Sequence, residues 1–178
     1  MDARSIGLIC GIVVGLLFAA LILKFVNRNG KMKVEYDELQ TINRNKAYKV
    51  GFSATMIYSG LLCTLSLIDI EIPMEVPVIF FSIIFVGVLA VASTSLWNNS
   101  YWGLSTNATR FWIIIMIAAA INFIVPIKQM MDGELIVNGK LSTPAVNLLC
   151  GMMILIIAVE AIVKQFVDKK AGGDDEES

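Results

Sequence analysis

The chain has 178 residues, of which 57% are apolar and 16% are charged, whereas a soluble domain is near half apolar with about a quarter of its residues charged. The formal net charge is −1 and there is no histidine, so the commonest general base and the commonest nitrogen ligand of metals are missing. The apolar residues lie in runs of roughly 17 to 25 residues, the length that crosses about 30 Å of hydrocarbon. We therefore expect a polytopic, all-α transmembrane helix bundle, with one membrane domain over residues 1–170 and no separate soluble domain.

The first apolar run covers residues 5–26. We expect a retained membrane span, because a single arginine precedes the run and it is longer than the apolar core of a usual signal peptide. Small residues recur in it at every fourth position: Gly7, Gly11, Gly15 and Ala19. This spacing lets two helices approach closely, so it predicts helix packing within the chain, with a second copy or with another protein.

A polar segment follows, and residues 34–49 are expected to form a cytoplasmic juxtamembrane helix. It would run into a second span at residues 50–68, either continuously or through a sharp join. Tyr36, Leu39, Asn43, Ala47 and Val50 should lie on one side of it. Its charged side chains support two hypotheses, a collar of cations at lipid headgroups or a docking surface for a cytoplasmic protein: Glu35, Asp37, Glu38, Arg44, Lys46 and Lys49.

The stretch YDELQTINRNKAYKVGF, residues 36–52, places an acidic-x-Gln segment and then Arg-x-Lys-Ala-Tyr before an apolar run. It resembles the juxtamembrane stretch of small, uncharacterised multi-pass membrane proteins of Gram-positive bacteria. The resemblance covers this stretch and the general layout. It implies a bacterial cytoplasmic membrane and says nothing about chemistry.

The second span carries Thr55, Ser59, Cys63 and Ser66 on one narrow face. A packing seam is the favoured interpretation, because hydroxyl groups can bond back to carbonyls of their own helix. The alternative is the wall of a polar pathway. All three cysteines, Cys10, Cys63 and Cys150, lie in apolar runs without a CxxC spacing, so we expect buried free thiols.

The third and fourth spans are expected at residues 76–97 and 111–127. Between them lies a connector rich in aromatic residues, which suit the membrane–water interface. In the fourth span, Asn122 needs a hydrogen-bond partner and Pro126 frees the carbonyl one turn before it. We expect a hydrogen bond from Asn122 to a neighbouring helix together with a kink.

The loop at residues 128–144 contains Asn138-Gly139 between two short apolar arms, a strong signal for a β-hairpin. A lone hairpin is marginal in water, so it should lie on the outer ends of the spans or on a partner. The fifth span is expected at residues 145–163, with Glu160 paired to Lys164 one turn later. Residues 171–178 are expected to be a disordered acidic tail.

With five spans, eleven Lys and Arg residues fall on one side of the membrane and three on the other, Arg4, Lys128 and Lys140. The positive-inside rule then predicts the N-terminus outside and the C-terminus in the cytoplasm, in the cell membrane. The eleven are Lys24, Arg28, Lys31, Lys33, Arg44, Lys46, Lys49, Arg110, Lys164, Lys169 and Lys170.

The sequence has no paired carboxylates within the membrane, no metal-ligand set, no nucleotide-binding glycine loop and no nucleophile beside a base. We therefore expect neither an enzyme nor a cofactor, and no nucleic acid as a partner. The predicted function is a non-catalytic membrane interaction protein, an accessory subunit, sensor or regulator. Its expected partners are the bilayer, other membrane helices and a cytoplasmic protein. The alternative is a small oligomeric channel or transporter.

Overall fold

The computed structural model describes Leu17 and residues 20–21, 36–102 and 108–173. Leu17, Ala20 and Leu21 are helical. The rest of the expected first span lies outside the described residues, and so do its stripe of Gly7, Gly11, Gly15 and Ala19, the predicted docking residue Glu35, and the tail from residue 174 onwards.

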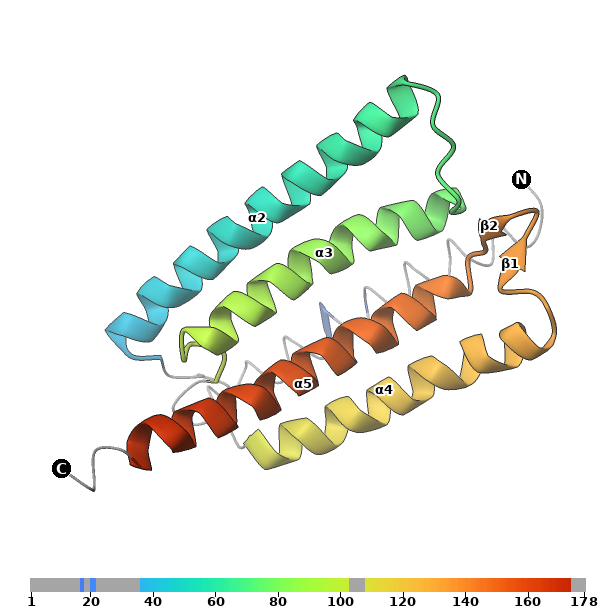
Figure 1. The fold of residues 1–178 in the computed structure, drawn as a ribbon. Helices are drawn as coiled ribbons and strands as arrows, with labels where there is room; N and C mark the ends of the chain where they lie inside the picture. Colours follow the sequence, from blue (N-terminus) through green and yellow to red (C-terminus); the bar gives the residue numbers. More distant parts are fainter. Residues whose placement is uncertain (1–16, 18–19, 22–35, 103–107, 174–178) are drawn as a thin grey trace. The chain divides into compact units, whose positions relative to one another are not determined.

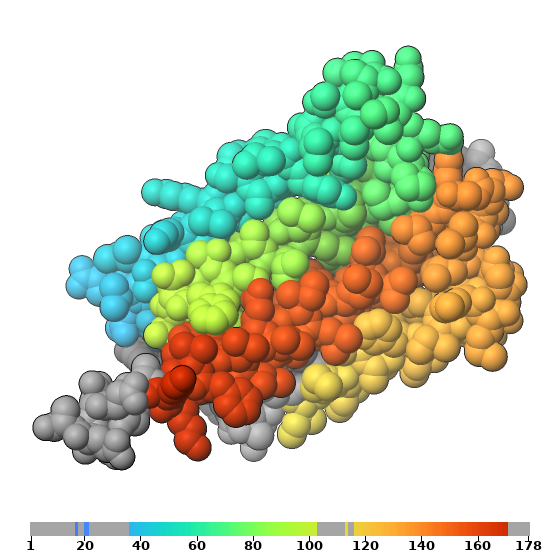
Figure 2. Space-filling view, viewed as in Figure 1, coloured from blue at the N-terminus to red at the C-terminus, as the bar shows by residue number. Residues whose placement is uncertain are grey.

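Four long helices belong to one compact unit, residues 36–178 (Figure 1). They are α2 (Glu38–Leu67), α3 (Val76–Trp97), α4 (Ala108–Met131) and α5 (Ala145–Gly173). Helix α2 packs on α3, α3 on α5, and α5 on α4. Figure 2 shows the side chains of these helices following one another in that order on one face. The sequence order and the spatial order therefore differ, because α5 lies between α3 and α4.

Three of these helices are long and apolar enough to cross a membrane: α2, α3, and α5 as far as Lys170. The predicted span at residues 76–97 coincides with α3, and the fifth begins at Ala145 as predicted. The fourth predicted span lies within α4, where the described apolar part, Met116–Met131, is shorter than a span. The described structure therefore supports three membrane-crossing helices and does not support the predicted five.

Helix α2 is a single unbroken helix of 30 residues, so the predicted juxtamembrane helix and second span are continuous. It begins at Glu38, later than the predicted residue 34, because Asp37 is its N-cap. The Asp37 carboxylate accepts from the backbone N–H of Gln40 at 2.6 Å, and the Gln40 side chain accepts from the backbone N–H of Asp37. This reciprocal capping box fixes the start of the helix. At the other end of the chain, α5 continues through residues 171–173, so those three residues are helical and not disordered.

Glycines allow the helices to pack closely at two crossings. A Cβ on Gly51 would collide with the side chain of Val91, and a Cβ on Gly87 would collide with the Thr55 hydroxyl. Helix α5 meets α4 in the same way, where Gly151 lies against the ring of Phe123. Small residues at such crossings let backbones approach where no hydrophobic effect drives helix association.

The predicted β-hairpin is confirmed. Strands β1 (Ile136–Val137) and β2 (Lys140–Leu141) pair antiparallel, and the turn residues Asn138 and Gly139 have φ of 52° and 76°. Two positive φ values are the requirement of a type I′ turn. The hairpin lies on the α2–α3 connector, where the Leu141 N–H donates to Pro73 and the Glu75 N–H donates to Leu141, both at 2.9 Å.

This contact joins two connectors at one end of the helices, which we call the hairpin end. The opposite end, the Arg44 end, contains the N-terminus of α2, residues 98–102 after α3, and the C-terminus of α5 (Figure 1).

Candidate functional site

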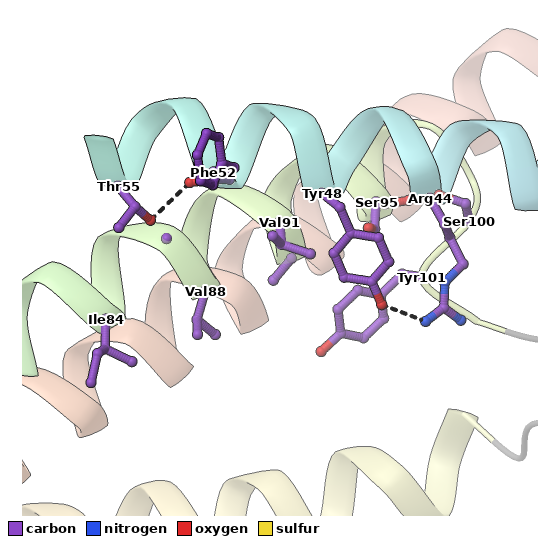
Figure 3. A pocket seen from close by; sticks show the side chains of 13 residues that line it. Arg44, Tyr48, Phe52, Thr55, Ile84, Val88, Val91, Ser95, Ser100 and Tyr101 are labelled. Atoms are coloured by element: carbon purple, nitrogen blue, oxygen red, sulfur yellow. Dashed lines mark hydrogen bonds between the residues drawn. The ribbon is translucent and has the colours of Figure 1, made fainter. Parts of the chain in front are cut away.

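A groove of about 610 Å³ runs between α2 and α3, on the side where Arg44 and Tyr48 project (Figure 3). We call it the α2–α3 groove. Its deep part is apolar apart from Thr55, whose hydroxyl is bonded to the Gly51 carbonyl, and its other polar side chains lie towards the Arg44 end. The lining residues are Arg44, Tyr48, Gly51, Phe52, Thr55, Ile84, Gly87, Val88, Val91, Ala92, Ser95, Ser100 and Tyr101.

Arg44 forms the cationic mouth of this groove. Its guanidinium carbon lies 4.0 Å from the ring centroid of Tyr36 and 6.0 Å from that of Tyr48. One guanidinium nitrogen donates to the Tyr48 hydroxyl at 3.1 Å. Such cation–π contacts hold a guanidinium in place without neutralising it. Within the part of the chain that the structure describes, no carboxylate forms an ion pair with Arg44.

The first turns of α2 are attached to the end of α3 by amide side chains. Gln40 donates to the backbone carbonyls of Asn99 and Trp102 at 3.2 and 3.4 Å, and Asn43 donates to that of Asn98 at 3.0 Å. This polar face was not predicted from the sequence. The spacing of Gln40, Asn43, Ala47 and Gly51, three or four residues apart, is the pattern that indicates a common side of the helix.

The residues predicted to share one side of this segment differ in their exposure. Ala47 is fully buried, but Leu39 and Val50 are 66% and 40% exposed. Because Asn43 contacts the connector after α3 and Gly51 contacts Val91, the residues between them lie beside the last turns of α3. Segment 38–49 therefore packs as part of the helix pair and is not a separate helix beyond it.

The predicted charged residues divide between two sides of α2. Arg44 faces the groove, whereas Lys46 and Lys49 are exposed. Asp37 and Glu38 are also exposed, and Asp37 caps the helix. The two lysines belong to a series of exposed residues at helical spacing, which we call the outer stripe: Ile42, Lys46, Lys49, Ser53, Ile57 and Gly60.

The residues of the predicted buried polar face of α2 differ in their burial. Thr55 is half-buried and donates to the Gly51 carbonyl at 2.9 Å, and Ser59 is half-buried. Ser66 and Cys63 are exposed, so the prediction that they are buried is wrong. The reason is that α2 diverges from α3 towards the hairpin end (Figure 1), and Leu62 is its last buried residue. Cys150 is half-buried, and Cys10 lies outside the described residues.

Asn122 does not bond to a neighbouring helix as predicted. Its amide donates to the Ala118 carbonyl in the preceding turn of α4 at 2.8 Å, and Pro126 is fully buried one turn later. Helix α4 continues through Pro126 to Met131. A side-chain amide can satisfy itself in this way on its own helix, so Asn122 is half-buried without joining two helices.

Glu160 and Lys164 are not paired. Lys164 is buried, and its ammonium lies 3.0 Å from both carboxylate oxygens of Asp168, one turn further on. Oε2 of Glu160 is buried and has no hydrogen-bond partner among the described residues. Lys164 therefore pairs with the more exposed Asp168, and not with Glu160 inside the apolar run.

Across the described ranges, no group of three His, Cys, Asp or Glu side chains is placed to hold a metal ion. Comparison of the chain with protein-family models, with curated proteins and with solved structures gives no match. The features that remain for a functional argument are the α2–α3 groove and the outer stripe of α2.

Proposed function

We propose that this chain is a non-catalytic membrane interaction protein, an accessory subunit, sensor or regulator, and that α2 is its docking helix. One observation carries the proposal. Every member of the outer stripe from Ile42 to Gly60 is exposed, while α2 makes its main helix contact with α3 on the other side. Ile57, at the centre of the apolar part, is 73% exposed.

The chemistry of the stripe changes along its length and defines the partner. Lys46 and Lys49 lie near the Arg44 end, whereas Ser53, Ile57 and Gly60 lie deeper. A Cβ on Gly60 would meet no atom within 4 Å, so another helix can approach closely there. We infer a partner with a membrane helix for the deep part and an acidic cytoplasmic segment for the lysines. It is a second copy or a different protein.

The distribution of charge supports a cytoplasmic position for the Arg44 end. Of the Lys and Arg residues in the described helices and connectors, two lie at the hairpin end, Lys128 and Lys140, and seven at the Arg44 end: Arg44, Lys46, Lys49, Arg110, Lys164, Lys169 and Lys170. The positive-inside rule assigns the richer end to the cytoplasm. A membrane-impermeant maleimide should label Asn138→Cys in intact cells and Lys169→Cys only in broken ones; the reverse pattern would invert the topology.

The docking proposal is tested by purification from native membranes in mild detergent, with the mass and composition of the eluted complex as the readout. Gly60→Leu should remove a stoichiometric partner, or a second copy, without loss of membrane insertion. Ala120→Leu is the matched control, since Ala120 is an exposed small residue on α4. A partner that survives Gly60→Leu contradicts the proposal. Gly11→Leu, in the same assay, tests the expected glycine stripe of residues 7–19.

A small oligomeric channel or transporter is the second candidate. The buried Oε2 of Glu160, which has no hydrogen-bond partner among the described residues, favours it. Ionisable groups inside membrane spans are costly and often mark ion pathways. This candidate predicts that liposomes containing the purified protein pass a small ion, and that Glu160→Gln abolishes the flux. Ion-tight liposomes with correctly inserted wild-type protein would reject it.

A further inference from the structure

We infer that the α2–α3 groove binds an anionic phospholipid, with one acyl chain along its apolar floor and the phosphate at Arg44. This inference concerns the side of α2 that the outer stripe does not use, and it stands independently of the docking proposal.

The position of the groove along the helices fits one leaflet of a bilayer. Helix α3 has 22 residues, about 33 Å at 1.5 Å per residue, which matches a hydrocarbon thickness of about 30 Å. The deep end of the groove is at Ile84 and Gly87, the middle of that helix. Its mouth includes Ser100, just past the end of α3. From Arg44 to Thr55, α2 rises about 16 Å, or about half the hydrocarbon thickness.

The walls of the groove are suited to a hydrocarbon chain. Phe52 of α2 and Ile84 and Val88 of α3 are 66%, 54% and 45% exposed, and all three line the groove (Figure 3). At the close crossing the side chain of Val91 lies against Gly51, and that of Thr55 lies against Gly87 with its hydroxyl bonded to the Gly51 carbonyl. A chain lying there would cover apolar surface on both helices at once.

The mouth of the groove is suited to a phosphate. A guanidinium has five N–H donors in a planar fork that matches phosphate oxygens, and Arg44 uses one of its nitrogens on the Tyr48 hydroxyl. That hydroxyl accepts from Arg44, and its own hydrogen has no acceptor among the described residues. Arg44 therefore offers an oriented positive charge that pairs with no carboxylate of the described residues, at the depth of the headgroups, with a phenol beside it as a further donor.

The charge selects an anionic lipid over a zwitterionic one. Phosphatidylcholine carries a quaternary ammonium next to its phosphate, which partly cancels the attraction to Arg44. Phosphatidylglycerol keeps the same phosphate and adds no cation. The preference should therefore depend on Arg44, whereas the apolar floor should contribute equally to both lipids.

The test uses the full chain in nanodiscs of phosphatidylcholine with a minority of phosphatidylglycerol, followed by native mass spectrometry of the lipids that stay bound. The wild type should retain one phosphatidylglycerol in preference to phosphatidylcholine. Arg44→Gln should weaken that retention about tenfold, as expected for the loss of a charge-assisted hydrogen bond. Lys169→Gln is the control, since Lys169 is an exposed cation at the same end of the helices.

A second variant, Ile84→Trp, fills the deep end of the groove without a change of charge and should also expel the lipid. Circular dichroism and elution volume establish that each variant is folded. Three results would overturn the inference: equal retention by the wild type and Arg44→Gln, equal losses in Arg44→Gln and Lys169→Gln, or no selectivity for phosphatidylglycerol. Unselective retention would assign the groove to bulk lipid, and a second copy of the chain in place of lipid would assign it to a dimer contact.

Discussion

One carboxylate oxygen of Glu75 accepts two hydrogen bonds from Thr143, from its backbone N–H and from its hydroxyl, each at 2.7 Å. Glu75 is the N-cap residue of α3, and Thr143 lies just before α5. The carboxylate also lies at the N-terminus of α3, where a negative charge is favourable. The start of one helix is thereby joined to the start of the other, 68 residues apart in sequence.

Replacement of Glu75 by alanine should lower the stability of the unit by about 1–2 kcal/mol, because both hydrogen bonds from Thr143 are lost while their donors remain. Thermal unfolding in detergent, followed by circular dichroism, measures the effect. Glu134→Ala removes an exposed carboxylate from the same end of the helices and should leave the midpoint unchanged. Equal midpoints for the two variants would mean that the contact with Thr143 does not stabilise the fold.

Glu71 and Lys140 predict a pH dependence at the hairpin. Their side chains form an ion pair at 2.8 Å, and the hydrogen bond and charge of Lys140 hold the pKa of the Glu71 carboxyl below its ordinary value of 4.5. A lowered pKa means that the folded protein binds this proton less tightly than the unfolded chain does. The contribution of the pair is therefore fully present above pH 4.5 and is lost as the pH falls through the lower folded-state pKa.

A carboxyl NMR titration of Glu71 checks this directly, and the midpoint should rise towards the ordinary value in Lys140→Gln. Because the side chains of Lys140 and Glu71 are 41% and 76% exposed, added salt should have the same effect on the wild type. A midpoint that responds neither to Lys140→Gln nor to salt would show that the pair does not exist in solution.

Two glycine-to-alanine changes should have opposite effects on stability. Gly87→Ala forces a methyl group against the Thr55 hydroxyl, which is itself bonded to the Gly51 carbonyl; overpacking of this kind costs about 1–3 kcal/mol. Gly60→Ala adds a methyl group in open space and should stabilise the helix by about 0.5–1 kcal/mol. The unfolding midpoints of the two variants in detergent measure both effects. A destabilising Gly60→Ala would mean that another segment covers the outer stripe.

The sequence predicted what depends on local pattern. Apolar length located α3 and the start of α5, and Asn138-Gly139 located the hairpin, because only a few residue types tolerate two successive positive φ values. The groove could not be predicted in this way. It requires α2 and α3 to cross at Gly51 and Gly87, and a single glycine in an apolar run does not identify its contact.

Polar residues near apolar runs were the other source of error. Asn122 was assigned a partner because it is a polar residue in an apolar run, whereas Glu160 was assigned a partner and Ser66 a buried place from spacing. A residue on a helix has several neighbours three or four positions away, and the packing of the helices decides which of them it contacts. Asn122 bonds to its own backbone, while Ser66 is exposed because α2 diverges from α3 near its end.

Lys164 pairs with Asp168 and not with Glu160, which predicts different effects of substitutions at the two acids. Its side chain is 10% exposed and that of Asp168 is 57% exposed, so loss of the carboxylate leaves a nearly buried cation without its anion. Removal of one partner from a buried pair is costly, up to several kcal/mol, and the exposure of Asp168 reduces this to about 1–2 kcal/mol. Asp168→Asn should therefore lower the unfolding midpoint.

Glu160→Gln should not lower it, because Glu160 forms no ion pair among the described residues and its buried Oε2 has no hydrogen-bond partner there that the amide would lose. Each variant replaces a carboxyl group of α5 by an amide, so a general effect of that exchange would move both midpoints together. The opposite ranking, with Glu160→Gln the more damaging variant, would mean that Glu160 is the acid that holds Lys164 in the membrane.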